Sequence, residues 1–355
     1  MSRSADQRID APVVFDPSAA AGTDEIIVAT YNVEALFDCK KDHEKQDHDY
    51  LPDGHYAWND AKLAQKIENL GRVVRSINAG RGPDILALNE VENRSVLTRL
   101  RDDALAGLGY ETVVHFETEC IYGLDNAILS RFKLAAEPRL HSVNDLRTEP
   151  SRRARGILEA TFDIGGVALT LFVNHWPGGA GRTVAQRVDI ARQLREHVER
   201  RLTKDPDSEV MVLGDFNATR DEEAFGTRGL RASWDPAAVV ASEKSATVFD
   251  TRPADAGIDA ATHFTGPYPY DGADGEWKAL DHIFLSRGLL DDKGLRWVPG
   301  STNVFRPSFL LAEDGTPRTF FERGVKPRSQ DLARAGFSDH LPVVTRLRRI
   351  GDRSS

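Results

Sequence analysis

The sequence predicts an α/β protein of the α+β type, in which β-sheets are covered on their outer faces by helices. Two observations lead to this prediction. Short apolar runs of strand length recur along most of the chain, and two longer segments have the three- and four-residue spacing of an amphipathic helix. Several consecutive strands separate the two helices, which disfavours a regular alternation of strand and helix and favours sheets with outer helices.

Each predicted strand is a short apolar run bounded by Gly, Pro, Asp or Asn. These runs cover residues 26–30, 84–88, 112–114, 126–129, 167–173, 210–213, 283–285 and 341–345. The helical spacing covers residues 61–77, where Leu63, Ile67 and Leu70 share a face, and residues 184–202, where Val188, Leu194 and Val198 recur. Three long polar segments, 39–60, 231–280 and 291–336, are expected to be loops, and loops of this length usually carry function.

The composition indicates one globular domain. The chain has 355 residues, of which 40% are hydrophobic and 28% charged, and a net charge of −9. We expect one domain over residues 25–349, with loose tails at 1–24 and 350–355. The negative net charge argues against sequence-independent nucleic-acid binding over a broadly basic surface, but it allows a local basic groove. With two cysteines, no signal-peptide pattern and no apolar run approaching the ~20 residues of a membrane span, a cytoplasmic location is expected.

Polar side chains gather at the ends of six predicted strands. They are Asn32 and Glu34, Glu90, Asn174 and His175, Asp215 and Asn217, Asp281, and Asp339 and His340. Because residues two apart on a strand point to the same side, Asp215 and Asn217 are expected to project into one pocket. A set of candidate ligands that is rich in oxygen and lacks cysteine suits Mg²⁺ or Mn²⁺ better than zinc. A histidine next to an aspartate supplies a positioned acid or base.

The same six motifs, in the same order, resemble those of the endonuclease/exonuclease/phosphatase superfamily of DNase I-like, metal-dependent phosphoesterases. They are Thr30-Tyr31-Asn32-Val33-Glu34, Leu88-Asn89-Glu90-Val91-Glu92, Asn174-His175-Trp176, Gly214-Asp215-Phe216-Asn217-Ala218, Leu280-Asp281-His282-Ile283-Phe284 and Ser338-Asp339-His340-Leu341-Pro342-Val343. The resemblance spans residues 25 to 348. It implies a four-layer α/β/β/α sandwich with one active site at the edges of two packed sheets.

The resemblance also implies roles for these residues. Glu90 would be the principal metal carboxylate, with Asn32, Glu34 and Asp339 close to the Mg²⁺ or Mn²⁺ ion. Asp215 would orient or deprotonate the attacking water, and Asn217 would hold the scissile phosphate. His340 paired with Asp281, together with His175, would contact phosphate oxygens in the transition state.

The chain departs from the family pattern at two places. Asn89 stands where the family usually has Gln, which predicts a weakened supporting contact. Glu34 stands where DNase-like relatives often have Asp, which leaves the geometry of the metal ligands open. Three basic or amide residues are candidates for substrate contact: Arg155, which relatives tend to share, Arg182 and Asn174. Arg152, Tyr268 and Tyr270 are weaker candidates.

We expect a metal-dependent phosphodiester hydrolase, most simply a nuclease with nucleic acid as its substrate. Two alternatives stay open: a hydrolase of a small ester, inositol phosphate or phospholipid headgroup, and a binding module without catalysis. Other residues are interpreted as structural. His43, His48 and His55 are expected to lie in a solvated loop rather than to form a second metal site, and Glu92 and Asn93 to be turn or surface residues.

Overall fold

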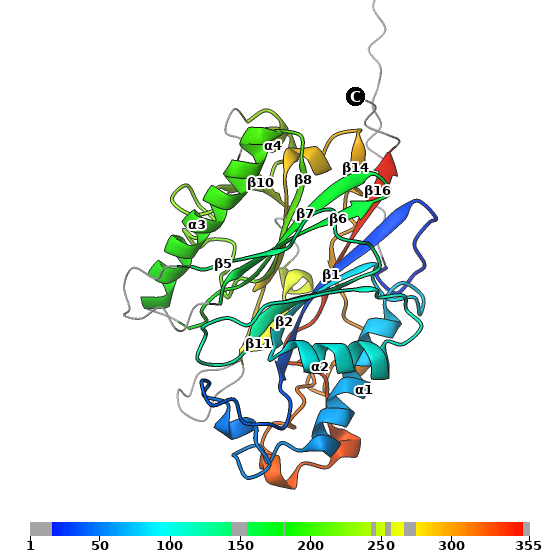
Figure 1. The fold of residues 1–355 in the computed structure, drawn as a ribbon, viewed down its shortest axis with the longest axis vertical. Coiled ribbons are helices and arrows are strands. Elements are labelled where there is room, and N and C mark those ends of the chain that lie inside the picture. The colour runs from blue at the N-terminus through cyan, green and yellow to red at the C-terminus, as the bar shows by residue number, and fades with distance from the viewer. Residues whose placement is uncertain are drawn as a thin grey trace, which may run out of the picture.

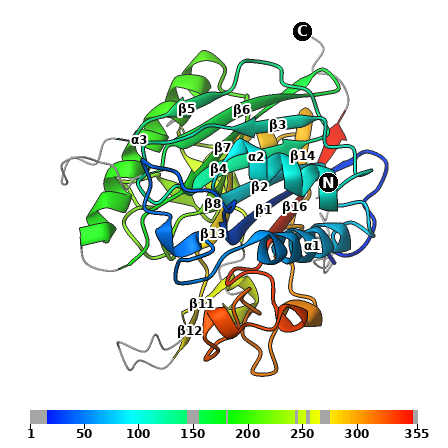
Figure 2. The same cartoon turned by 60° about the horizontal axis from the view of Figure 1, so that its bottom comes forward.

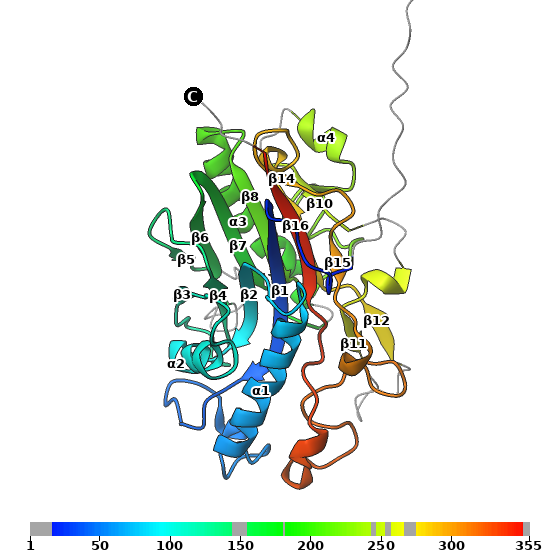
Figure 3. The same ribbon diagram turned by 90° about the vertical axis from the view of Figure 1, so that its right-hand side faces the viewer.

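A computed structural model describes residues 16–143, 155–179, 182–242, 246–252, 257–265 and 275–350. Arg152, Tyr268 and Tyr270 lie outside these residues. In the described part of the chain, the strands form two seven-stranded sheets and one two-stranded sheet. Figures 1 and 3 show the two large sheets packed face to face, with helices outside them.

The first large sheet runs in the order β14-β16-β1-β2-β4-β3, and β15 pairs with β16. Its strands are β1 (Glu25–Leu36), β2 (Ile85–Val91), β3 (Thr112–His115), β4 (Asp125–Ser130), β14 (Gly294–Trp297), β15 (Asn303–Val304) and β16 (Val343–Ile350). Within it, β1 and β2 are parallel, and Asn32 pairs with Asn89. The two strands therefore deliver the residues that follow them to the same end of the sheet.

The second large sheet runs in the order β5-β6-β7-β8-β13-β10-β9. Its strands are β5 (Arg139–His141), β6 (Ile157–Ile164), β7 (Val167–His175), β8 (Glu209–Asp215), β9 (Ala232–Ser233), β10 (Val248–Asp250) and β13 (Asp281–Leu285). Here His175 pairs with Asp215 across the parallel strands β7 and β8, and Asp281 pairs with Asp215 across β13 and β8. Three predicted site residues thus stand in one row.

The helices are α1 (Asp60–Ser76), α2 (Arg94–Arg99), which continues into a π-helical turn (Leu100–Ala104), α3 (Arg182–Lys204) and α4 (Pro236–Val240). Two of them, α1 and α3, lie where the amphipathic spacing predicts them, and the short helices α2 and α4 were not predicted. Asn59 caps α1 by accepting a hydrogen bond from the backbone N–H of Lys62, and Asn93 caps α2 in the same way through Val96. Both caps supply an acceptor to N–H groups that the helix itself leaves without a partner.

Three hydrophobic clusters correspond to the three interfaces of a four-layer sandwich. Leu63, Ile67 and Leu70 of α1 pack on the outer face of the first sheet. Leu194 and Val198 of α3 pack on the outer face of the second sheet. Alternate residues of the inner faces, among them Val28, Ile85, Ala87, Leu158, Leu171 and Met211, form the cluster between the sheets. The α/β sandwich is therefore the observed fold, as predicted.

The segments expected to be loops contain more regular structure than the sequence indicates. Segment 231–280 includes α4, β9 and β10, and β11 (His263–Thr265) and β12 (Glu276–Lys278), which pair with each other. Segment 291–336 includes β14 and β15, and Figure 2 shows its later, orange part beside β11 and β12 at the bottom of the molecule. These strands have two to four residues each, too short for a period-two pattern to stand out. Single 3-10 turns occur at His48–Tyr50, Gly257–Ala260, Arg287–Leu289, Ser308–Leu310, Pro327–Ser329 and Leu332–Arg334.

Candidate active site

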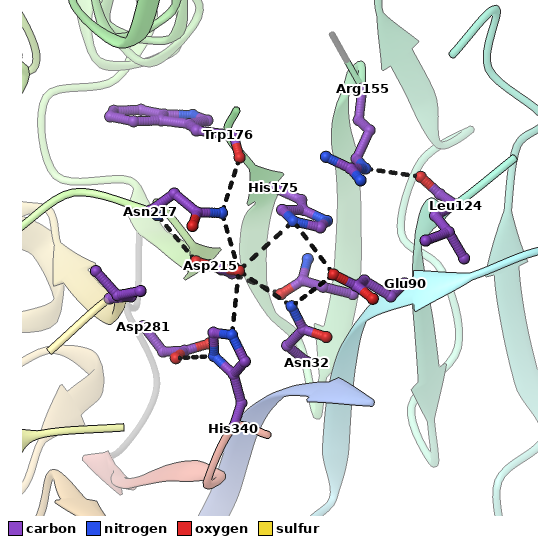
Figure 4. A network of polar contacts seen from close by, with 12 residues as sticks. Asn32, Glu90, Leu124, Arg155, His175, Trp176, Asp215, Asn217, Asp281 and His340 are labelled. Atoms are coloured by element: carbon purple, nitrogen blue, oxygen red, sulfur yellow. Dashed lines mark hydrogen bonds and ion pairs between the residues drawn. The ribbon is translucent and has the colours of Figure 1, made fainter. Parts of the chain in front are cut away.

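The polar residues predicted from six strand ends lie together where the two sheets meet. Figure 4 shows Asn32 and Glu90 from the first sheet facing His175 and Asp215 from the second, with His340 and Asp281 beside them. Gly214 is necessary for this arrangement. Its φ is +131°, and a Cβ at this position would lie 2.0 Å from the carbonyl oxygen of Asn174. Glycine therefore lets β8 run close enough to β7 to place Asp215 next to His175.

Three of the predicted site residues have left-handed backbone conformations. The φ angles are +53° at Glu34, +68° at Glu90 and +47° at Asn217. Glu34 and Glu90 fall where the pairing of β1 with β2, and of β2 with β4, shifts register. Such irregularities turn a side chain away from the regular alternation of the strand, and left-handed residues other than glycine carry roughly 1–2 kcal/mol of strain. Strain gathered at one place is typical of a functional site.

Asp215 is at the centre of the polar network. Its Oδ2 accepts hydrogen bonds from the side-chain amides of Asn32 at 3.0 Å and Asn217 at 3.2 Å, and its Oδ1 accepts one from the backbone N–H of Asn217 at 2.9 Å. The residue is 1% exposed. Burial raises the pKa of Asp215 to about 7, against the opposing effect of His340 and with the help of Asp281. A carboxylate with this pKa can take up a proton at neutral pH.

His340 is paired with Asp281. Its Nδ1 lies 2.7 Å from Asp281 Oδ2, and its Nε2 lies 3.7 Å from Asp215 Oδ2. Burial opposes protonation, but the carboxylates of Asp281 and Asp215 outweigh it and hold the pKa of His340 well above its usual value. His340 is therefore a protonated imidazole at neutral pH, and the pair can donate a hydrogen bond to an anionic substrate.

His175 faces the same pocket in the opposite charge state. Its Nε2 lies 3.5 Å from Asp215 Oδ2 and 3.7 Å from Glu90 Oε1. Burial, with the positive charges of Arg155 and His340 nearby, holds the pKa of His175 well below its usual value. The ring is therefore neutral. The site contains one charged and one neutral imidazole, on either side of Asp215.

The predicted metal-binding residues lie on the first-sheet side of the site. Glu90 Oε1 accepts a hydrogen bond from the Asn32 amide at 3.1 Å, and Glu90 Oε2 accepts one from the backbone N–H of Ala35 at 2.9 Å. Glu34 Oε2 accepts one from the backbone N–H of Phe320 at 2.9 Å and lies 3.6 Å from Lys66 Nζ. Sequence reasoning had not identified Lys66, which lies in the apolar stripe of α1 yet is 0% exposed.

These carboxylates fit a divalent cation. Burial raises the pKa of Glu34 to about 7, because the positive charge of Lys66 only partly offsets burial and the negative charges of Asp339 and Glu90. Burial alone would raise the pKa of Asp339, but His340, His263 and Lys66 lower it below its usual value. Excess negative charge held out of water is the condition that a hard cation relieves, and carboxylate and amide oxygens are its preferred ligands.

Potential metal ligands also approach one another closely in two groups. Within the described residues, ligand atoms lie within 4.8 Å of one another in the group of His263, Asp339 and His340 and in the group of Asp215, Asp281 and His340. Neither group includes Glu34 or Glu90. Likewise, neither includes a histidine of the 39–60 segment, where the His48 side chain is 70% exposed. His263 was not identified from the sequence, because it belongs to a segment that is expected to be a loop.

Asn89 joins the two sheets beneath the site. Its Nδ2 donates to Asn126 Oδ1 at 2.7 Å and to the carbonyl of Asn174 at 2.9 Å, and its Oδ1 accepts from the backbone N–H of Asp215 at 3.1 Å. Asn126 in turn donates to the carbonyl of Gly156 at 3.0 Å. The side-chain amide of Asn89 thus makes three hydrogen bonds, and the weakening expected from the shorter side chain stays a prediction.

The substrate-contact candidates have different placements. Arg155 is partly buried, donates from Nε to the carbonyl of Leu124 at 3.0 Å and lies near His175 (Figure 4). Asn174 is 0% exposed, and its amide donates to the carbonyl of Phe172 and accepts from Trp176 Nε1. It therefore supports the strand end rather than facing a substrate. Arg182 begins α3, and its side chain lies outside what the structure describes.

Glu92 is buried, although the sequence suggests a turn or surface position. It is 5% exposed and accepts a hydrogen bond from the backbone N–H of Asp38 at 2.5 Å. Burial raises the pKa of Glu92 to about 8. Its neighbour Asn93 caps α2, as a turn residue would. Glu90 and Glu92 are thus two buried carboxyl groups two positions apart, of which only Glu90 belongs to the polar network.

Comparisons with known proteins agree with this arrangement. The family model described as endonuclease/exonuclease/phosphatase family matches residues 27–349. No curated protein matches the chain. Among the helices that the structure describes, none has the length and apolar character needed to cross a bilayer.

Three solved structures illustrate the likeness. TDP2 from C. elegans is 16% identical with a TM-score of 0.55, over 91% of this chain and 75% of that chain. D. rerio TDP2, complexed with a single strand DNA product, is 16% identical with a TM-score of 0.53, over 91% and 98%. An endonuclease/exonuclease/phosphatase from Beutenbergia cavernae is 18% identical with a TM-score of 0.54, over 94% and 73%. At these identities the likeness is one of fold.

Proposed function

Since the chain belongs to the endonuclease/exonuclease/phosphatase family, whose members are typically metal-dependent phosphoesterases, we propose that it is a divalent-metal-dependent phosphodiesterase that cleaves nucleic acid. The observation that carries the proposal is the pairing of Asp215, with a pKa of about 7, and the His340–Asp281 pair in one buried network. A proton acceptor and a proton-bearing imidazole 3.7 Å apart supply the two groups that in-line hydrolysis of a phosphodiester requires.

In the proposed reaction, a water oxygen attacks phosphorus and the opposite P–O ester bond breaks. Asp215 orients the water and accepts its proton at a carboxylate oxygen. Protonated His340, held in place by Asp281, donates a hydrogen bond to a phosphoryl oxygen, and Asn217 holds the phosphate beside it. A divalent ion bound to Glu90, with Asn32, Glu34 and Asp339 near it, would offset the charge that develops on the phosphate and the leaving oxygen.

Two features favour nucleic acid over a small ester. Arg155 lies beside His175, where its guanidinium can contact a backbone phosphate next to the one that is cleaved. In addition, the D. rerio TDP2 structure, which has the same fold, is a complex with a single strand DNA product. The net charge of −9 favours a small ester instead, because it repels a polyanion at long range.

A matched pair of variants tests the catalytic proposal. Glu90→Gln removes a site carboxylate, whereas Glu92→Gln replaces a neighbouring buried carboxyl group that is largely protonated at neutral pH. We expect Glu90→Gln to lower the rate by at least about a hundredfold and Glu92→Gln to change it little. Hydrolysis of bis-p-nitrophenyl phosphate with and without EDTA measures both variants. An unchanged, EDTA-sensitive rate in Glu90→Gln would exclude the proposed role of that carboxylate.

The substrate is tested with a panel of single-stranded DNA, duplex DNA, RNA and inositol phosphates. A nucleic-acid substrate predicts a rate that falls steeply with salt and a KM that rises when Arg155 is changed to Gln. Arg131→Gln is the control, since Arg131 pairs with Asp84 away from the site. Preference for an inositol phosphate with no salt dependence would favour the small-ester alternative.

A further inference from the structure

His263 stands against the catalytic histidine, in a segment that none of the motifs includes. It is the first residue of β11, and its backbone forms an isolated antiparallel bridge with His340. The centroids of the two imidazole rings are 4.5 Å apart, with the ring planes tilted by 35°. The bridge fixes the position of His263 relative to His340, so the two rings do not depend on a loose loop for their approach.

The Nδ1 atoms of both rings are next to oxygen acceptors. His263 Nδ1 lies 3.1 Å from the carbonyl oxygen of Asp339, and His340 Nδ1 lies 2.7 Å from Asp281 Oδ2. A neutral ring held in this way has its proton on Nδ1 and a lone pair on Nε2, whereas protonated His340 must first release its Nε2 proton to an entering ion. Histidines that bind metals are held in this way, with the other ring nitrogen donating to a carboxylate or a backbone carbonyl.

Asp339 completes a group of three. Its Oδ2 lies 3.8 Å from His263 Nδ1, and potential ligand atoms of His263, Asp339 and His340 all lie within 4.8 Å of one another. The side chains of Asp339 and His263 are 34% and 18% exposed. An ion can therefore reach the group from solvent, whereas Asp215 and Asp281 are 1% and 0% exposed.

We propose that His263, Asp339 and His340 form a binding site for a transition-metal ion of the Zn²⁺ class, which shares Asp339 with the oxygen-ligand site around Glu90 but adds the two imidazoles that this site lacks. Two imidazoles and one carboxylate select Zn²⁺ or Co²⁺ over Mg²⁺, which prefers oxygen ligands. Three protein ligands leave a fourth position for water. An ion on Nε2 of His340 displaces its proton to solvent and removes the hydrogen-bond donor. On the proposed function, Zn²⁺ therefore inhibits hydrolysis that Mg²⁺ supports.

The second group of potential ligands is less suited to an ion. Asp215, Asp281 and His340 are 1%, 0% and 5% exposed, and both carboxylate oxygens of Asp215 already accept hydrogen bonds from Asn217. An ion there would have to break these bonds and those from Asn32. His263 is therefore the residue whose replacement separates the two groups, because only the proposed site contains it.

The test is binding of Co²⁺ and Zn²⁺ to the full-length protein without Mg²⁺. Co²⁺ is followed by its visible absorption and Zn²⁺ by calorimetry. The variant is His263→Asn, which keeps a side-chain N–H for the carbonyl of Asp339. The control is His48→Asn, which changes an exposed histidine in the 39–60 segment. We expect one ion per chain, bound at least about tenfold more weakly by His263→Asn and unchanged in His48→Asn. Thermal unfolding of each variant checks that it is folded.

Three results would overturn the proposal: no binding by the unaltered protein, equal binding by His263→Asn, or loss of binding in Asp281→Asn but not in His263→Asn. The inhibition arm measures Mg²⁺-supported hydrolysis with added Zn²⁺, which should inhibit the unaltered protein and His48→Asn but not His263→Asn. If Zn²⁺ binds through His263 but no phosphodiester is hydrolysed under any condition, the site stands and the proposed function fails. The two are therefore separable.

Discussion

Replacement of Asn89 by Ala should show whether the spacing between the two sheets controls catalysis. The Asn89 amide makes three hydrogen bonds, of which one reaches Asn126 in its own sheet and two reach Asn174 and Asp215 in the second sheet. Glu90, the next residue, belongs to the first sheet. The same side chain thus links the strand that holds the proposed metal carboxylate to the strand that holds the proposed base.

The expected loss of stability follows from these bonds. Asn89 is 0% exposed, so water does not replace its partners without rearrangement. At about 1 kcal/mol for each hydrogen bond, Asn89→Ala should lower the free energy of unfolding by about 3 kcal/mol. If the release of Asp215 moves the base by a fraction of an ångström, the turnover number should fall by roughly 10- to 100-fold, since a displacement of about 1 Å can lower a rate by about 100-fold.

Urea unfolding gives the stability, and hydrolysis of a small diester gives kcat and KM. Asn78→Ala is the matched control, because Asn78 is also a buried amide, 3% exposed, and its partners, the N–H of Ala21, the guanidinium of Arg81 and the carbonyl of Gly82, belong to neither strand end. It should lose comparable stability and keep its kcat. If Asn89→Ala is destabilised but has an unchanged kcat, the sheet-to-sheet link is structural only and the reasoning is wrong. Asn89→Gln should be destabilised by about 1–3 kcal/mol through overpacking.

Three further predictions concern protons in the site. The rate should rise as pH passes through about 7, where Asp215 becomes a base, and should stay high until His340 loses its proton; a flat profile would contradict the assignment. Asp281→Asn should move the alkaline limb of the pH–rate profile to lower pH and reduce kcat about tenfold or more, because the Asp281 carboxylate raises the pKa of His340. An alkaline limb at unchanged pH would show that Asp281 does not keep His340 protonated. For Glu34, burial gives a pKa of about 7 against 4.5 when unfolded, so the folded protein binds more protons between these values, and the contribution of Glu34 to stability falls as pH rises. In metal-free urea unfolding, Glu34→Gln should therefore gain stability relative to the unaltered protein from about pH 5 to pH 7, and a pH-independent difference would contradict this.

Most of the strands and helices that position the site could be predicted, because the sequence patterns that indicate them are local. Apolar runs that end in polar residues located β1, β2, β7, β8 and β13, and the helical spacing located α1 and α3 within two residues at each end. Such patterns indicate sheets with outer helices but do not order the layers. The resemblance supplied the four-layer arrangement, which the three hydrophobic clusters now bear out.

The features that could not be predicted depend on contacts between distant segments. The left-handed backbone at Glu34 and Glu90 is set by register shifts between paired strands, which no single strand encodes. The bond from Asn89 to the backbone of Asp215 joins two sheets, and no sequence pattern indicates that these two residues meet. The apolar spacing of α1 predicts its buried face, but not that Lys66 lies in that face and pairs with Glu34.

The long segments between strands complete the site rather than merely covering it. The backbone of Phe320, in segment 291–336, holds the carboxylate of Glu34, and His263, in segment 231–280, stands against His340. The row of His175, Asp215 and Asp281, by contrast, is set mainly by strand pairing, with Asn89 of the first sheet bonded to the backbone of Asp215. Because the pairing and the segments are separate parts of the chain, a change in the segments can alter metal preference and substrate without moving the groups that transfer protons. Differences in chemistry among chains with this fold should therefore be sought first in segments 231–280 and 291–336, and only then in the strand ends.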